Sequence, residues 1–131
     1  MLIDHIGVAV ESLEKMVPLY SVLLGHDPEH FEEVVEQKVK TAFFSVGDPN
    51  IELLEATSPE SPIAKYIEKN GRGGIHHICF KVDDVAAKLA ELKSNGFVLI
   101  DEKPRLGAHG KLVAFVHPKS TGGVLIELSQ G

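Results

Sequence analysis

An internal repeat is the feature of this sequence that most constrains its fold. The segment Ile3–Val10 returns 72 residues later as Ile75–Val82, with a histidine at the same place in each copy. Towards the end of each half, Ile51–Leu53 matches Ile126–Leu128 at an offset of 75, as expected if the loops differ slightly in length. Self-similarity of this kind indicates one supersecondary unit that is used twice.

Each half of the repeat contains one segment of helical spacing among segments in which apolar and polar residues alternate. This pattern predicts a strand, a helix and three further strands in each half. The sequence therefore predicts an α+β fold built from two βαβββ modules, over about 1–57 and about 74–131, within a single domain spanning 1–131.

Spacing and capping residues predict three helices. The first covers about 13–24 and stops at Gly25, although Pro18 inside it suggests a late start or a kink. The second covers about 85–95. A short third helix, over about 61–70, lies in the linker between the modules, where a serine can cap it and a proline occupies its first position.

The repeated histidines and glutamates are candidate metal ligands. Because side chains alternate along a strand, His5 and His77 leave the apolar face, and so do Glu52 and Glu127. Taken singly, each is more often a packing histidine or a solvated glutamate. A carboxylate in a half-buried strand is costly unless it is paired or bound to a metal, and the recurrence in register favours a shared cation. Two imidazoles and two carboxylates suit Co²⁺, Zn²⁺ or Ni²⁺ better than Mg²⁺ or Ca²⁺.

Composition excludes several classes of protein. A formal net charge of −6 disfavours sequence-independent nucleic-acid binding, and the longest apolar runs fall far short of the roughly 20 residues that cross a bilayer. The single cysteine, Cys79, cannot form an internal disulfide and is expected to pack. The first residues do not read as a secretion signal, so we expect a cytoplasmic protein.

Several stretches of the chain resemble the vicinal oxygen chelate superfamily and, within it, the methylmalonyl-CoA epimerase family. The resemblance covers nearly the whole chain and implies the glyoxalase fold, in which paired modules form a cupped, barrel-like mixed sheet around a metal. The stretches that carry it are Asp4-His5-Ile6-Gly7-Val8-Ala9-Val10, Ser61-Pro62-Ile63-Ala64-Lys65-Tyr66, Gly74-Ile75-His76-His77-Ile78, Val82-Asp83-Asp84-Val85 and His117-Pro118-Lys119-Ser120-Thr121-Gly122-Gly123-Val124-Leu125-Ile126-Glu127-Leu128.

The resemblance implies a divalent-metal-dependent isomerase that removes the C2 proton of methylmalonyl-CoA on one face and returns it on the other. A cation chelating the thioester oxygen and the malonyl carboxylate would stabilise the enolate. His5, Glu52, His77 and Glu127 fall on the family's metal ligands, and Glu127 also falls on a catalytic base. A glutamate that binds metal acts as a base only if it loosens or uses its free oxygen.

One position departs from the family pattern. Some members carry a second glutamate base in the strand after the first helix, where this chain has Thr41. Threonine is not a general base at neutral pH, so the proton transfer on the opposite face must use another group or a water. Glu36 and Lys40 are the neighbouring candidates.

Residues near the second module's loops are candidate substrate contacts. The basic residues, among them Arg105 and Lys119, could meet the phosphates of coenzyme A, with Gly107 letting the loop close and His117 lining the acyl pocket. A solvated loop and a fixed turn are the alternative readings. We expect an acyl-CoA substrate, no nucleic-acid or membrane partner, and a homodimer.

Two other functions stay open at this point. Glyoxalase I, a lactoylglutathione lyase, resembles this chain in the same ligand set, and a non-catalytic small-molecule binding module is a second alternative. A dioxygenase would typically hold Fe²⁺ with two histidines and one carboxylate, so Glu52 as a fourth ligand argues against it.

Overall fold

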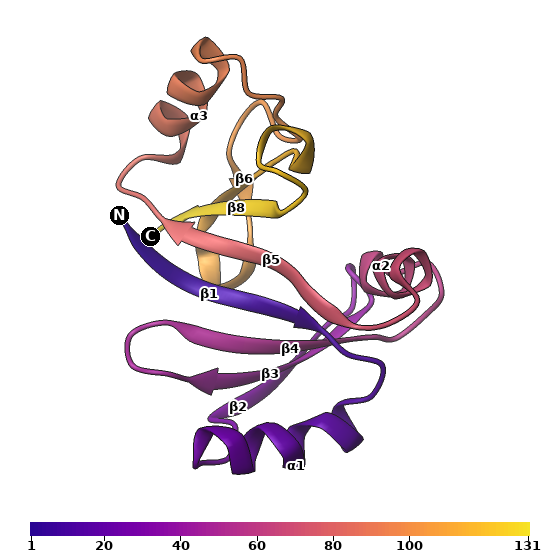
Figure 1. Ribbon diagram of the computed structural model, residues 1–131. Coiled ribbons are helices and arrows are strands. Elements are labelled where there is room, and N and C mark those ends of the chain that lie inside the picture. Colours follow the sequence, from indigo (N-terminus) through magenta and orange to yellow (C-terminus); the bar gives the residue numbers. More distant parts are fainter. The chain divides into compact units, whose positions relative to one another are not determined.

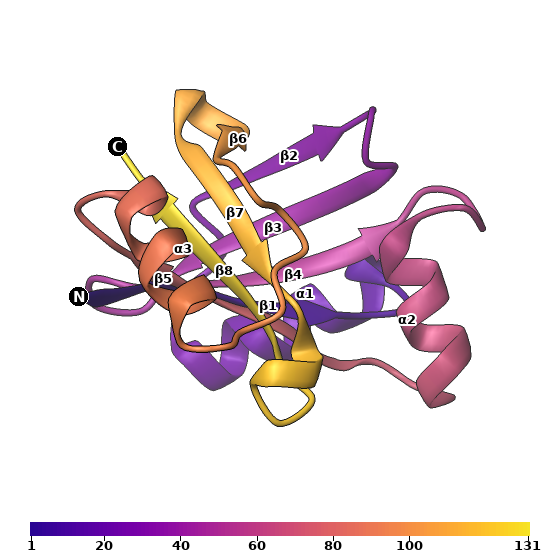
Figure 2. The same cartoon turned by 90° about the horizontal axis from the view of Figure 1, so that it is seen from above.

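The computed structural model describes residues 1–131, apart from the side chain of Ala108. The chain forms two compact units. The N-terminal unit is His5–His76, and the C-terminal unit combines Met1–Asp4 with His77–Gly131. Both carry the strand, helix and three strands predicted from the repeat; Figure 1 labels these elements except β7, which is labelled in Figure 2.

The sheet of the N-terminal unit has the strand order β2-β3-β4-β1. Strands β1 and β4 run parallel, whereas β3 is antiparallel to both of its neighbours, β2 and β4. The elements are β1 (Leu2–Ala9, with His5–Ala9 in this unit), α1 (Leu13–Leu24), β2 (His30–Val34), β3 (Val39–Ser45), β4 (Asn50–Ala56) and α2 (Pro62–Asn70).

The sheet of the C-terminal unit repeats this order as β5-β8-β7-β6, with β5 and β8 parallel and the other pairs antiparallel. Helix α3 packs on one face of β7 and β8 (Figure 2). The elements are β5 (Gly74–Lys81, with His77–Lys81 in this unit), α3 (Val85–Ser94), β6 (Arg105–Leu106), β7 (Leu112–Val116), β8 (Leu125–Gln130) and the short 3-10 helices Ala108–Gly110 and Pro118–Ser120.

The helix boundaries follow from capping residues. Ser12 caps α1 by accepting a hydrogen bond from the amide of Lys15, and Gly25 ends the helix in the left-handed conformation. Helix α2 begins at Pro62 after the capping Ser61, as predicted. The late start suggested for the first helix is wrong, because α1 begins at Leu13 and continues through Pro18.

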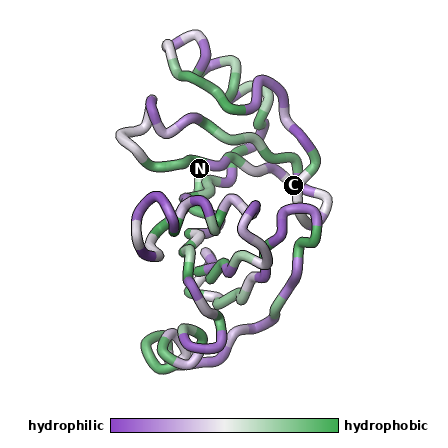
Figure 3. The backbone as a smooth tube through the Cα atoms, turned by 90° about the vertical axis from the view of Figure 1, so that its right-hand side faces the viewer, coloured by the Kyte–Doolittle hydropathy of each residue, from purple (hydrophilic) through white to green (hydrophobic). Residues whose placement is uncertain are grey.

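In the N-terminal unit, buried apolar clusters lie on both faces of the sheet. Phe44 and Leu53, each 0% exposed, pack on the α1 side, and α1 is largely apolar along its length (Figure 3). Ala9 and Leu54 form a separate cluster with Ile63 of α2 on the other face. Ala9, on the face of β1 that also carries His5, is therefore covered by α2.

The C-terminal unit buries its own cluster under α3. Val85 and Leu89 of the helix meet Ala114, Val116 and Leu128 of the sheet. Cys79 is 0% exposed, which confirms that it packs in the interior. Among the described residues, no helix is long and apolar enough to cross a membrane.

Gly73 lies where backbone segments approach closely. A Cβ at this position would lie 2.3 Å from the carbonyl oxygen of Ala9, a backbone atom that cannot rotate away. We expect Gly73→Ala to lower the free energy of unfolding by about 1–3 kcal/mol, since overpacking forces the backbone to shift. Chemical denaturation measures the change.

Gly71→Asn is the matched control for Gly73→Ala. A side chain at Gly71 meets open space, and its φ of +73° is one that asparagine tolerates. Equal stability of Gly73→Ala and the wild-type chain would contradict the close approach of Gly73 to Ala9.

Candidate active site

The first histidine–glutamate pair lies within the N-terminal unit. Glu52 of β4 is the register partner of Gly7 on β1 and so shares a sheet face with His5, two residues earlier on that strand. The Nδ1 atom of His5 lies 3.3 Å from Oε2 of Glu52. Their side chains are only 12% and 14% exposed, so the pair is largely withdrawn from water.

The second pair occupies the equivalent place in the C-terminal unit. Glu127 of β8 is the register partner of Cys79 on β5, and His77 lies two residues before Cys79 on the same face. The Nε2 atom of His77 lies 3.4 Å from Oε1 of Glu127, and the side chains are 10% and 13% exposed. The repeat seen in the sequence thus reproduces the same contact in each unit.

The distances within the two pairs suit shared metal coordination. At 3.3 and 3.4 Å, the nitrogen–oxygen separations exceed the usual hydrogen-bond range of about 2.7–3.2 Å. Two ligand atoms about 2.0–2.2 Å from one tetrahedral ion lie about 3.3–3.6 Å apart. Imidazole nitrogen and carboxylate oxygen are also the donors that borderline divalent ions accept, so each pair fits two ligands of one such ion.

Phe115 links the second pair to an arginine. It is the register partner of Glu127 across β7 and β8, and its ring lies edge-on to the ring of His77, with centroids 6.3 Å apart. The guanidinium carbon of Arg105 lies 5.3 Å from the centroid of the same ring. Arg105 is the partner of Val113 on β7 and so belongs to the sheet face that carries His77 and Glu127.

Asp101 holds this arrangement together. One carboxylate oxygen accepts a hydrogen bond from the backbone amide of Phe115 at 2.8 Å, and the other lies 3.2 Å from Nε of Arg105. Neither Asp101 nor Phe115 was predicted from the sequence as a site residue. A signal for Phe115 was present, because Ala114-Phe115 repeats Ala42-Phe43, and Phe43 is the register partner of Glu52.

The other predicted substrate contacts lie in turns. His117 accepts a hydrogen bond at Nδ1 from the amide of Lys119, at 2.9 Å, and so caps the short 3-10 helix between β7 and β8. A Cβ on Gly107 would lie 2.9 Å from the side chain of Val113, so a close approach to β7 favours glycine there. Among the predicted substrate contacts Arg105, Gly107, His117 and Lys119, it is Arg105 that lies over the ring of Phe115.

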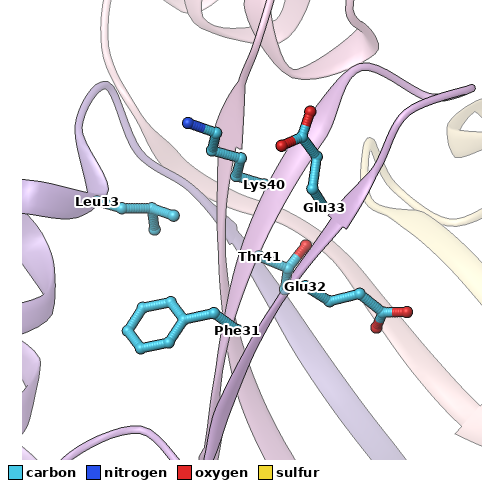
Figure 4. Close-up of a pocket in the computed structure, with 6 residues that line it drawn as sticks. All are labelled: Leu13, Phe31, Glu32, Glu33, Lys40 and Thr41. Carbon is cyan, nitrogen blue, oxygen red and sulfur yellow. The ribbon is translucent and has the colours of Figure 1, made fainter.

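Neither candidate for a second base, Lys40 or Glu36, lies on the strand face that carries Glu52. Thr41 is 4% exposed and pairs with Glu32 of β2, on the face that carries Glu52. Lys40 points to the opposite face, into a pocket of about 230 Å³ beside α1 (Figure 4). Glu36 lies in the turn between β2 and β3. Glu32 also lines this pocket, and its side chain points away from the ring of Phe31 (Figure 4).

The comparisons with known proteins agree with this fold. The sequence pattern of the Glyoxalase/Bleomycin resistance protein/Dioxygenase superfamily matches residues 4–115. The chain belongs to this superfamily. The predicted α+β class, with two βαβββ modules, is thereby confirmed.

Within the superfamily, the chain belongs to the methylmalonyl-CoA epimerase family. It is 40% identical to the mitochondrial methylmalonyl-CoA epimerase of Homo sapiens over 128 residues, which are 98% of this chain and 73% of that protein. It is also 40% identical to the ethylmalonyl-CoA/methylmalonyl-CoA epimerase of Cereibacter sphaeroides over 98% of this chain and 96% of that one. A variant of the Streptomyces coelicolor methylmalonyl-CoA epimerase, solved in complex with 2-nitronate-propionyl-CoA, superposes with a TM-score of 0.88 at 36% identity, covering 98% of this chain and 93% of the other.

Proposed function

We propose that this chain is an isomerase that interconverts the 2R and 2S forms of methylmalonyl-CoA. The observation that carries the proposal is the pair of equivalent histidine–glutamate contacts, His5 with Glu52 and His77 with Glu127. Its support from comparison is the 40% identity to proteins named as methylmalonyl-CoA epimerases, over nearly the whole chain.

From their recurrence in the sequence, His5, Glu52, His77 and Glu127 are the proposed ligands of one divalent cation, with Co²⁺, Zn²⁺ and Ni²⁺ as the candidates. Each pair supplies an imidazole nitrogen and a carboxylate oxygen at a spacing suited to adjacent ligands. When bound, such a cation supplies Lewis-acid stabilisation of the negative charge that develops on the thioester oxygen. His5, Glu52 and His77 act as ligands only.

Glu127 also accepts the C2 proton of the substrate. Its Oε1 atom lies 3.4 Å from Nε2 of His77, and a glutamate that binds metal through one oxygen can accept a proton with the other. The proton passes from C2 to this carboxylate, the electron pair of the broken C–H bond enters the enolate, and a proton returned to the other face of C2 completes the inversion. Thr41 supplies no base, so that return uses another group or a water.

The acyl-CoA contacts come from the second module. Arg105, Gly107, His117 and Lys119 remain the proposed substrate-binding residues, and Phe115 adds an apolar ring next to His77. The homodimer and the cytoplasmic location stay predictions from the sequence.

A substrate comparison tests the proposal. Metal-reconstituted protein is incubated in parallel with one stereoisomer of methylmalonyl-CoA and with the hemithioacetal of methylglyoxal and glutathione. We expect metal-dependent inversion of the first and no turnover of the second. Turnover of the hemithioacetal alone would make the protein a lactoylglutathione lyase, and inactivity towards both would favour a binding module.

A further inference from the structure

We infer that Arg105 binds the free carboxylate of a dicarboxylic acyl thioester and that Asp101 positions Arg105 for this task. The inference rests on the proposed function and deepens it, because it assigns the side chain that distinguishes a malonyl thioester from a thioester with an uncharged acyl group. The Asp101, Arg105 and Phe115 contacts carry it, and all three residues lie within the C-terminal unit.

Arg105 is anchored on one side and accessible on the other. Its Nε atom faces Oδ1 of Asp101 at 3.2 Å, and its guanidinium carbon lies 5.3 Å from the ring centroid of Phe115. The side chain of Asp101 is 18% exposed, whereas that of Arg105 is 49% exposed. The N–H groups of both Nη atoms therefore remain for an anion, and a carboxylate that gives one oxygen to the cation can accept hydrogen bonds from them with its other oxygen.

The position of Arg105 favours the acyl end of the substrate over the nucleotide end. The ring of Phe115 lies next to both the guanidinium of Arg105 and the ring of His77, and Phe115 pairs with Glu127 in register. The anion that Arg105 binds therefore lies close to the reacting carbon. The phosphates of coenzyme A are separated from that carbon by the whole pantetheine arm, so the acyl carboxylate is the anion in reach.

Asp101 contributes orientation rather than a substrate contact. Its Oδ2 atom accepts the hydrogen bond of the Phe115 amide at 2.8 Å, which fixes the carboxylate relative to β7. A fixed carboxylate in turn restricts the guanidinium to the ring of Phe115. An ordinary surface ion pair would hold Arg105 without any consequence for ligand choice.

Calorimetric titration of the metal-reconstituted protein with malonyl-CoA and with acetyl-CoA tests the inference. We expect Arg105→Gln to weaken malonyl-CoA binding about 10- to 100-fold, as loss of a charged hydrogen bond does, and acetyl-CoA binding by less than about 3-fold. Arg105→Lys keeps the positive charge but lacks the planar guanidinium, so its affinity for malonyl-CoA should lie between those of the wild-type chain and Arg105→Gln. Lys93→Gln removes the same charge from α3, where Lys93 pairs with Glu102, and should change neither affinity.

Equal losses of affinity for the two thioesters in Arg105→Gln would mean that Arg105 binds the phosphates of coenzyme A. Unchanged affinities would mean that Arg105 forms only a surface ion pair. Either result overturns the inference but does not contradict the proposed function. A wild-type chain that bound neither thioester would overturn both.

Asp101→Asn tests the positioning role, because asparagine can still accept the amide of Phe115. It should weaken malonyl-CoA binding in the wild-type background and have no further effect in the Arg105→Gln background. Additive losses in the double variant, or a lowered melting temperature that accounts for the loss, would show that Asp101 acts only on the fold.

Discussion

Glu127→Gln is expected to lower kcat about 10²- to 10⁴-fold while leaving the fold intact, as removal of a general base does. Glutamine has the shape of glutamate but neither its charge nor its basicity, so the C2 proton loses its acceptor. The flanking Ile126 and Leu128 and the strand register of β8 do not depend on the charge. Steady-state turnover of methylmalonyl-CoA measures the effect, with a thermal melt to confirm folding.

Glu102→Gln is the matched control for Glu127→Gln. Glu102 is a surface glutamate whose side chain is 62% exposed and pairs with Lys93, so the same chemical change there should leave kcat unaltered. Turnover close to wild type in Glu127→Gln would remove Glu127 from the proton transfer.

His77→Gln and Glu52→Ala are expected to lose the metal. Each removes one ligand of the proposed set, and losing even a hydrogen-bond partner of a ligand costs roughly 10- to 100-fold in metal affinity, so losing the ligand itself should cost more. Glutamine at position 77 also limits the cavity left by a side chain that is only 10% exposed. Metal content after dialysis, by elemental analysis, should fall from about one ion per chain towards zero.

His26→Gln separates a general histidine effect from ligand loss. His26 lies beyond the end of α1, is partly exposed and faces Glu29 at 3.5 Å. We expect full metal content in this variant. Unchanged metal content in both His77→Gln and Glu52→Ala would overturn the ligand assignment.

Local signals in the sequence were enough for most of the fold. The repeat identified both modules because strand pairing in each unit depends on the same alternation, and capping at Ser12 and Ser61 fixed two helix starts. Pro18 suggested a late start of the first helix, which the structure does not show. Proline removes a single backbone hydrogen bond, and the packing of α1 on the sheet outweighs this cost. The cover of Ala9 by α2 could not be predicted, because alternation gives the face of a strand residue but not the helix that packs on it.

Only part of the candidate site could be predicted from the sequence. His5, Glu52, His77 and Glu127 could be identified because they recur in register, and the structure pairs them within each unit. The anchoring of Arg105 could not, since it depends on Asp101 in an irregular segment reaching the backbone of β7. Contacts of this kind have no periodicity for a sequence to reveal.

The most direct test of the proposed epimerisation follows the C2 position itself. Metal-reconstituted protein is incubated in deuterated water with one stereoisomer of methylmalonyl-CoA, and both inversion and deuterium at C2 are recorded over time. We expect inversion accompanied by solvent deuterium, and loss of both when the metal is removed. Inversion without deuterium uptake, or no reaction at C2 in the metal-loaded protein, would contradict proton abstraction by Glu127 and exchange with solvent.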